Sequence, residues 1–329
     1  MTSEPRLTIG LPVYNGERYL EGSLQSILGQ TYEDFELLIV DNASSDGTQR
    51  ISREHGRADK RVRYIRHNQN IGVARNHNFA VEAAKGELFR WAADDDLLES
   101  TGLERCVDLI DNDGPDTVLA FPQTEVIDED GHHVRYWAEQ GAVDDDTPDA
   151  RLRALLEHRA GHLHGGFLPP FYGVVRTSVL RSTRLLRYFF PPDVVLVVEL
   201  ALRGKLAEVP EPLYRRRQHA AQSGGWSTSS DLQRTLWTYP GFRGCPMPQS
   251  RVLLGYIGAV LEAPLTRGER GRCLAPVAAY VFRDGRARAI LGELREAITT
   301  SAIARLDRAR RGWAVGSDSV VESQNDRDA

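Results

Sequence analysis

The segment that most constrains this chain is an apolar run that opens directly into three adjacent carboxylates. Residues 89–93 (FRWAA) are followed by Asp94, Asp95 and Asp96. Three like charges at a strand end repel one another, and each loses hydration if it is buried, so they are tolerable only in water or around a cation. Carboxylate oxygens suit Mg²⁺ or Mn²⁺, which complete their coordination with water and substrate phosphates. The triplet is either a solvated acidic loop or a divalent-cation site, and its surroundings favour the cation site.

Those surroundings alternate between strand-like and helix-like segments. Apolar runs of strand length occur in residues 7–16, 36–41 and 62–65, before the acidic run. Turns rich in Gly, Asn, Asp and Ser follow them, and helical spacing then appears, as in Leu20, Leu24, Ile27 and Leu28. Alternation of this kind predicts a mainly parallel sheet covered by helices. Ligands of such sheets bind beyond the carboxyl ends of the strands, so we expect Asp41 to lie near the triplet.

Four segments in this frame together resemble the family-two glycosyltransferases of GT-A fold. They are residues 12–16 (PVYNG), 40–48 (VDNASSDGT), 70–76 (NIGVARN) and 93–96 (ADDD). Their order and spacing match the family through about the first 125 residues, and a thinner likeness continues through residues 171–176, 193–204 and 209–219. The resemblance implies an α/β fold with a Rossmann-like, mainly parallel sheet flanked by helices. It also implies transfer of a sugar from a nucleotide-sugar donor.

The same resemblance suggests how the chain is divided. We expect a catalytic domain over residues 1–225, with a nucleotide-sugar half up to about residue 125 and an acceptor half over residues 126–225. Residues 226–315 contain helical patterns separated by Gly and Pro, which predict a helical C-terminal appendage and leave a homodimer through these helices open. Residues 316–329 are polar and acidic, and we expect them to be disordered.

A nucleoside diphosphate sugar presents a flat base, a ribose and two phosphates to its protein. By the resemblance, Pro12 and Tyr14 offer an apolar face for the base, and Asp41 accepts the ring N–H of uracil or thymine. Arg75 near a helix start suits a base carbonyl or a phosphate. A core aromatic at Tyr14 and a solvated arginine at Arg75 are the structural alternatives. Further donor contacts are implied for Asn15, Asn42, Asn76, Asp94 and Asp95.

The triplet contains an Asp-x-Asp pattern at Asp94 and Asp96. In the resembled family the first carboxylate faces the ribose and the last one binds the ion. If the alignment slips by one residue, to Asp95 and Asp96, the last carboxylate is still Asp96. Asp96 is therefore the predicted ligand of Mn²⁺ or Mg²⁺, with Asp94 and His219 as further candidates. A loop histidine is the alternative for His219. The ion would stabilise the departing nucleotide.

Inverting transfer also needs a general base that removes the proton of the acceptor hydroxyl. Asp193 precedes an apolar helix and matches the Asp of the family's Glu-Asp pair, although Pro192 stands where the family has Glu. A plain N-cap is the structural alternative for Asp193. Glu199, nearly two helical turns later, is the second choice.

Composition bounds the partners and the location. A net charge of −5 and a pI near 6.0 offer no basic field for nucleic acid, despite the three arginines at 215–217. Three widely separated cysteines indicate a reducing compartment. No signal peptide or membrane-spanning run is evident, so we expect a cytoplasmic protein. The arginines of residues 305–311 leave a peripheral contact with the inner face of the membrane open.

These inferences predict an inverting, metal-dependent glycosyltransferase. It would move a sugar from a UDP or dTDP sugar to a hydroxyl of a saccharide, a lipid-linked acceptor or a secondary metabolite. A sugar nucleotidyltransferase is one alternative, but residues 12–18 contain a single Gly and no Lys, unlike the phosphate loop of that class. A non-catalytic nucleotide-sugar-binding protein is the other, and Pro192 is its only support.

Overall fold

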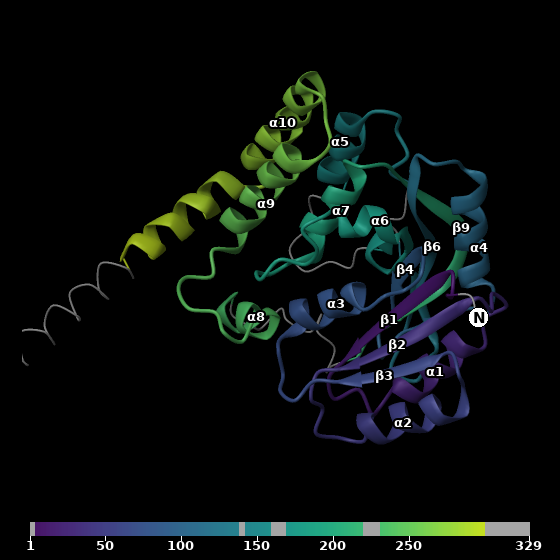
Figure 1. Cartoon of the computed structure of the whole chain (residues 1–329). Helices are drawn as coiled ribbons and strands as arrows, with labels where there is room; N and C mark the ends of the chain where they lie inside the picture. The colour runs from purple at the N-terminus through teal and green to yellow at the C-terminus, as the bar shows by residue number, and fades with distance from the viewer. Residues whose placement is uncertain (1–3, 138–141, 159–168, 220–230, 300–329) are drawn as a thin grey trace, which may run out of the picture.

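The computed structural model describes residues 4–137, 142–158, 169–219 and 231–299. Within these ranges the strands form one nine-stranded sheet of order β3-β2-β1-β4-β8-β6-β9-β5, with β7 paired to β6 (Figure 1). The strands are β1 (Leu7–Val13), β2 (Phe35–Asp41), β3 (Val62–Arg66), β4 (Leu88–Trp91), β5 (Leu97–Leu98), β6 (Thr117–Ile127), β7 (His133–Tyr136), β8 (Val174–Arg176) and β9 (Lys205–Arg217).

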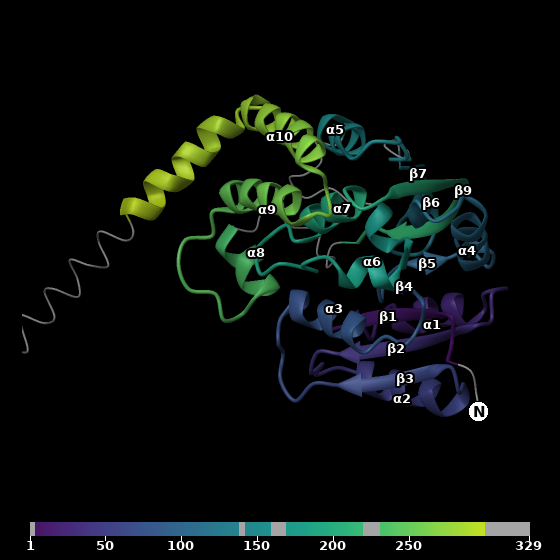
Figure 2. The same ribbon diagram turned by 45° about the horizontal axis from the view of Figure 1, so that its top comes forward.

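Helices cover the sheet, and others continue beyond it toward the C-terminus (Figures 1 and 2). They are α1 (Leu20–Leu28), α2 (Thr48–Ala58), α3 (Val73–Glu82), α4 (Gly102–Asn112), α5 (Pro148–His158), the 3₁₀ helix η1 (Pro169–Tyr172), α6 (Thr177–Arg181), α7 (Asp193–Ala201), α8 (Asp231–Thr238), α9 (Pro248–Glu262) and α10 (Arg267–Phe282). Residues 286–299 are also helical. The predicted α/β architecture with a helical C-terminal region is confirmed.

The N-terminal half contains the parallel part of the sheet. β1 pairs in parallel with β2 and β4, and β2 pairs in parallel with β3. Every residue of β1 and β2 is buried, because helices cover both faces of these strands. Leu37 and Ile39 join the core that includes α1 and α2, whereas Leu38 and Val40 join the core that includes α3. The near-continuous apolar runs in the sequence therefore reflect burial on two sides.

Beyond β4 the sheet is mixed. β8 is antiparallel to β4 and β6, and β5 is antiparallel to β9, while β6 and β9 run parallel. β5 follows the acidic triplet directly, and its residues Leu97 and Leu98 pair with Arg215 and Tyr214 of β9. This pairing brings the triplet beside the C-terminal end of β9, which lies more than a hundred residues further along the chain.

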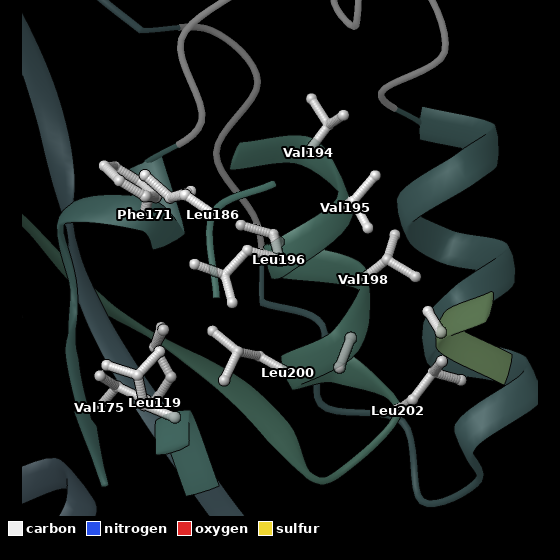
Figure 3. Close-up of a cluster of buried hydrophobic side chains, with 14 of the residues drawn as sticks. Leu119, Phe171, Val175, Leu186, Val194, Val195, Leu196, Val198, Leu200 and Leu202 are labelled. Atoms are coloured by element: carbon white, nitrogen blue, oxygen red, sulfur yellow. The ribbon is translucent and has the colours of Figure 1, made fainter. Parts of the chain in front are cut away.

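The core that includes α3 also surrounds α7 (Figure 3). Residues 194–201 of this helix are all buried, and a helix that is apolar on every side must be covered on every side. Leu200 lies on the side of α7 that faces Leu119 of the sheet (Figure 3). On another side, a Cβ added at Gly255 of α9 would lie 2.7 Å from the side chain of Val195, so the two helices approach this closely only because residue 255 is glycine.

The C-terminal helices share this core with the sheet. Tyr256 and Val260 of α9 are fully buried within it. Among the described residues no helix has the length and apolar character needed to cross a membrane. The predicted boundaries near residues 225 and 315 and the predicted disordered tail at 316–329 lie outside the described residues.

Candidate active site

The carboxyl ends of β1, β2 and β4 meet at one edge of the sheet, and predicted site residues gather there. Asp41 is the last residue of β2, and the triplet at 94–96 lies between β4 and β5. The loop after β1 lies directly against the triplet, since a Cβ added at Gly16 would be 2.1 Å from a carboxylate oxygen of Asp94. A side chain at position 16 would displace that carboxylate, so the two loops form one surface only with glycine there.

Asp96 is fixed by contacts to β9. Its side chain is 7% exposed. The hydroxyl of Tyr214 donates to Oδ2, and the backbone N–H of Arg217 donates to Oδ1 at 2.7 Å. Each oxygen accepts one hydrogen bond and keeps a second lone pair, so these donors orient the carboxylate without preventing it from binding an ion. The contacts anchor Asp96 to β9, and its role as a metal ligand stays a prediction.

Asp95 is the more accessible carboxylate beside it. Its side chain is 26% exposed, and its Oδ2 lies 3.1 Å from Nε2 of His219. The imidazole ring packs against the ring of Tyr19, with 4.8 Å between the ring centres. A carboxylate oxygen and an imidazole nitrogen that face each other can both ligate a divalent transition ion. The structure thus brings His219 to the triplet through Asp95.

Arg217 holds this corner together. Its Nε donates to the backbone carbonyl of Asp95 at 2.9 Å, and its Nη1 donates to the backbone carbonyl of Glu129 at 2.9 Å. The guanidinium carbon also lies 4.8 Å from the ring centre of Tyr19. Arg217 is 8% exposed. Arg217 is the last residue of β9 and stands two residues before His219. Its side chain therefore links the backbone of the triplet to the end of β9.

Repulsion within the triplet changes its protonation. Burial and the negative charge of Asp95 raise the pKa of Asp94 to about 8 and the pKa of Asp96 to about 7. The protein alone therefore does not favour three ionised carboxylates at neutral pH, because each ionisation opposes the next. A bound cation would relieve this repulsion. The carboxylate donors of the site therefore suit a divalent ion.

Asp41 is fully buried and engaged by its own neighbours. Tyr64 donates to its Oδ2 at 2.7 Å, Arg66 also donates to Oδ2, and the backbone N–H of Ser44 donates to Oδ1 at 2.8 Å. Burial would raise the pKa of Asp41, but the hydrogen bonds from Ser44, Tyr64 and Arg66 lower it below its usual value. The carboxylate is thus ionised and anchors the loop that follows β2.

Three asparagines predicted to touch the donor also order the loops of this edge. Asn15 has a left-handed φ of 55°, and its side-chain oxygen accepts the backbone N–H of Ser45 at 2.8 Å. Asn42 accepts the backbone N–H of Ile71 at 2.8 Å. Asn76 is buried and donates to a backbone carbonyl of β2 at 3.0 Å. These contacts give the donor edge a defined shape.

The remaining donor candidates differ in accessibility. Tyr14 is 47% exposed at the end of β1, whereas Pro12 is buried. The guanidinium carbon of Arg75 lies 4.9 Å from the ring centre of Tyr239 and 5.4 Å from that of Tyr188. The two tyrosine rings stack on each other, with 5.1 Å between their centres. Arg75 therefore connects α3 to the segment after α8, where both Figures 1 and 2 show α8 beside the start of α3.

Asp193 is the first residue of α7, and Pro192 occupies the N-cap position. The carboxylate is therefore not the N-cap that the sequence left as its alternative role. Burial raises the pKa of Asp193 to about 6. Burial, Asp96, Asp95 and Asp193 together raise the pKa of Tyr172 well above its usual value, so these carboxylates share that tyrosine as a neighbour. The role of Asp193 as the base stays a prediction.

Glu199 lies in a different environment. It is 1% exposed, and it accepts the backbone N–H of Arg184 at 2.7 Å and the Nε–H of the same residue. Arg184 also donates to the backbone carbonyl of Gly255 in α9 at 2.7 Å. The buried ion pair joins α7 to the segment before it and, through Arg184, to α9.

Two site residues were not singled out from the sequence. Tyr214 binds Asp96, and its ring stacks on Tyr172 with 5.3 Å between centres. Arg90 of β4 is 1% exposed, and its guanidinium carbon lies 5.3 Å from the ring centre of Tyr214. The one signal in the sequence was Arg90 itself, a charged residue at the centre of an apolar strand. Such a residue indicates a buried cation that needs partners for its charge.

Comparisons with known proteins identify the family. Residues 8–182 match the sequence profile described as "Glycosyl transferase family 2". An uncharacterized glycosyltransferase of Rickettsia felis is 32% identical over 164 residues, which cover 49% of this chain and 26% of that protein. The putative glycosyltransferase EpsH of Bacillus subtilis is 27% identical over 215 residues, covering 65% of this chain and 56% of EpsH. The chain spans less than half of the length of the Rickettsia relatives it matches.

A solved structure provides the fold comparison. S. aureus TarS, residues 1–349, in complex with UDP-GlcNAc superimposes with a TM-score of 0.63 at 18% sequence identity, covering 86% of this chain and 74% of that one. This likeness supports the GT-A fold. The profile match extends over more than half of the sequence and includes the loop after β1, Asp41 and the acidic triplet. The chain therefore belongs to glycosyl transferase family 2.

Proposed function

We propose that this protein transfers a sugar from a nucleoside diphosphate sugar to an acceptor hydroxyl, with inversion at the sugar carbon and with a divalent metal ion. The observation that carries the proposal is the contact between Asp95 and His219 beside two further carboxylates. This contact would supply a cation site, and Asp193 at the start of α7 would supply the separate base that such a transfer needs.

The metal would be held by Asp95 and His219, with Asp94 as a further candidate. Their carboxylate donors fit Mn²⁺ or Mg²⁺, and the imidazole nitrogen favours Mn²⁺ of the two. Burial and the charge of Asp95 raise the pKa of Asp94 and of Asp96, which a bound cation would oppose. When bound, such an ion supplies positive charge to the diphosphate leaving group. Asp96 would act indirectly by holding the triplet against β9 through Tyr214.

Asp193 would be the general base. Its carboxylate would accept the proton of the acceptor hydroxyl while the oxygen of that hydroxyl attacks the sugar carbon and the nucleoside diphosphate departs. A pKa of about 6 leaves Asp193 ionised at neutral pH yet more basic than an ordinary aspartate. Glu199 remains the second candidate, but its ion pair with Arg184 makes it the less suitable one.

The donor is proposed to carry uracil or thymine. Tyr14 exposes a ring at the end of β1, and Asp41 lies at the end of the adjacent strand. Asp41 would read the base either directly or through the loop that it fixes, and Arg75 would act through its contacts with Tyr188 and Tyr239 or through a phosphate. The UDP-GlcNAc bound to TarS supports a UDP sugar as the first donor to test.

Calorimetry with UDP-GlcNAc, dTDP-glucose and GDP-mannose, with and without Mn²⁺, tests the proposal. Tight binding of a uracil or thymine nucleotide sugar only in the presence of Mn²⁺, together with slow release of the nucleoside diphosphate into water, would support it. Release of pyrophosphate from a nucleoside triphosphate and a sugar phosphate would instead identify a nucleotidyltransferase. Binding without any turnover across a panel of hydroxyl acceptors would favour the non-catalytic alternative.

A further inference from the structure

The helix at residues 286–299 carries an exposed apolar face that the proposed transferase site does not use. Leu291 is 61% exposed, Leu294 is 42% exposed and Ile298 is 70% exposed. These residues are spaced by three and then four positions, which places them on one side of a helix. Phe282, at the end of α10 just before this helix, is 82% exposed. Four large apolar side chains therefore lie in water within a short stretch of chain.

The exposed charges on this helix are sorted by side, and the buried Arg286 lies on the side of Glu293. Arg288 and Arg295 are exposed and stand three residues before and four residues after Leu291, so they border the apolar face. Glu293, two residues after Leu291, lies about 200° around the helix axis from it. Basic residues thus accompany the apolar side chains, while this acidic residue lies on the opposite side.

The acidic side is the one attached to the protein. The carboxylate of Glu293 accepts the backbone N–H groups of Gln249 and Ser250, each at 2.8 Å, and the hydroxyl of Ser250 at 2.6 Å. These donors lie in the first turn of α9, where a carboxylate is favoured by the unpaired N–H groups. Glu293 faces α9, so the opposite side of the helix, which bears Leu291 and the two arginines, points away from α9. Figure 1 shows this helix projecting from the rest of the molecule.

We propose that this face, formed by Leu291, Leu294 and Ile298 with Arg288 and Arg295, binds the surface of a membrane that contains anionic lipids. An amphipathic helix with arginines beside its apolar stripe lies in the lipid interface, where the apolar side chains enter the acyl boundary and the guanidinium groups reach the phosphates. The arginines that follow in the sequence, at positions 305, 308, 310 and 311, have the same charge sign. The inference does not depend on the proposed transfer reaction.

A second copy of the chain is the less suitable partner for this face. Two such faces packed together would bring the arginines of both copies to the edges of one apolar seam, and like charges there oppose association. An anionic lipid surface instead attracts each arginine, and this attraction is worth about a fivefold increase in affinity per residue near the membrane. Charge complementarity therefore favours the lipid surface.

Flotation of the full chain with phosphatidylcholine vesicles, with and without phosphatidylglycerol, tests the proposal. We expect binding only to the anionic vesicles. Arg288→Gln combined with Arg295→Gln should weaken that binding by roughly 25-fold, on the estimate of about fivefold per arginine. Leu291→Ser combined with Ile298→Ser should reduce it by more than about tenfold, since each change removes apolar surface from the interface.

Val134→Ser is the matched control, because Val134 is a 49% exposed apolar residue on β7, outside the proposed face. It should leave vesicle binding unchanged, and all variants should keep the wild-type unfolding temperature because the altered side chains are exposed. Equal binding to neutral and anionic vesicles, or no binding to either, would overturn the proposal. So would light scattering that shows a dimer of the wild type and a monomer of the Leu291 and Ile298 variant.

Discussion

The Nε2 atom of His219 lies 3.1 Å from Oδ2 of Asp95, across a sequence separation of 124 residues. The contact closes the loop after β4 onto the segment that follows β9, and it involves a carboxylate that is 26% exposed. Neither residue is conspicuous without the other, since one is the middle of three aspartates and the other follows a run of arginines. Their meeting defines where a divalent ion would enter.

Asp95→Asn and His219→Ala should each weaken Mn²⁺-dependent binding of the nucleotide sugar by at least about tenfold, because each change removes a proposed ligand. Binding of the nucleoside alone should be much less affected. Calorimetric titration of Mn²⁺ in the presence of UDP measures the effect. Full Mn²⁺ dependence in both variants, with loss in Asp94→Asn instead, would assign the ion to another part of the triplet.

Asp96→Ala should lower the free energy of unfolding by about 1–3 kcal/mol for each buried donor that loses its acceptor, namely the hydroxyl of Tyr214 and the N–H of Arg217. Urea unfolding monitored by circular dichroism gives the value. Tyr214→Phe is the comparison, because it removes one donor and keeps the carboxylate. A fully stable Asp96→Ala protein that has lost metal binding would restore Asp96 as a ligand.

Asp193→Asn should reduce kcat by roughly a hundredfold or more and leave donor affinity nearly unchanged, because a base acts on the acceptor hydroxyl alone. The wild-type rate should increase with pH through about 6, as Asp193 loses its proton, and this acid limb should be absent from the residual activity of the variant. Initial rates measured from pH 5 to 8, with Mn²⁺ saturating at each pH, report both quantities.

The same group affects stability. The pKa of Asp193 in the folded protein exceeds its value of about 4 in an unfolded chain, so the folded state binds more protons between these values and loses stability as the pH rises through them. Asp193→Asn removes that penalty and should raise the unfolding temperature at pH 7. Thermal scans at pH 4 and pH 7 should show the gain only at the higher pH.

Glu199→Gln should lower stability and leave turnover nearly unchanged, the opposite of the effects expected for Asp193→Asn. Breaking the buried pair with Arg184 should cost about 3–5 kcal/mol of stability, because a guanidinium that is 17% exposed loses its carboxylate. Turnover per folded molecule should remain close to that of the wild type. If this variant folds normally and is inactive while Asp193→Asn retains its turnover, the base lies within α7 at Glu199.

Much of the fold could be predicted from the chain because the parallel strands are buried on both faces. Residues 37–40 are an unbroken apolar run for that reason, and residues 89–93 are apolar except for Arg90. Each run is followed directly by a carboxylate of the site, Asp41 or Asp94. The pairing of β5 with β9 could not be predicted, since two residues at 97–98 carry no strand signal. The mixed direction of the sheet beyond β4 follows from contacts between distant segments.

The individual site residues were harder to separate. The spacing of the triplet cannot distinguish Asp95 from Asp96, because the difference between them is set by Tyr214 and Arg217 of a distant strand. Arg75 likewise looked like a donor ligand from its helix position, whereas its contacts with two tyrosines depend on where α8 docks. The local sequence thus indicates which edge of the sheet carries the candidate site. Long-range packing determines the contacts of each residue within it.

The absence of a side chain at Gly255 has a consequence for anyone who recombines this protein. α9 rests on Val195 of α7, two residues after Asp193, with no room for a methyl group between them. The position of the proposed base in the site therefore depends on a helix of the C-terminal region. A chimera that kept the sheet and exchanged these helices would keep the proposed donor site. It would hold Asp193, the proposed base, in a different position.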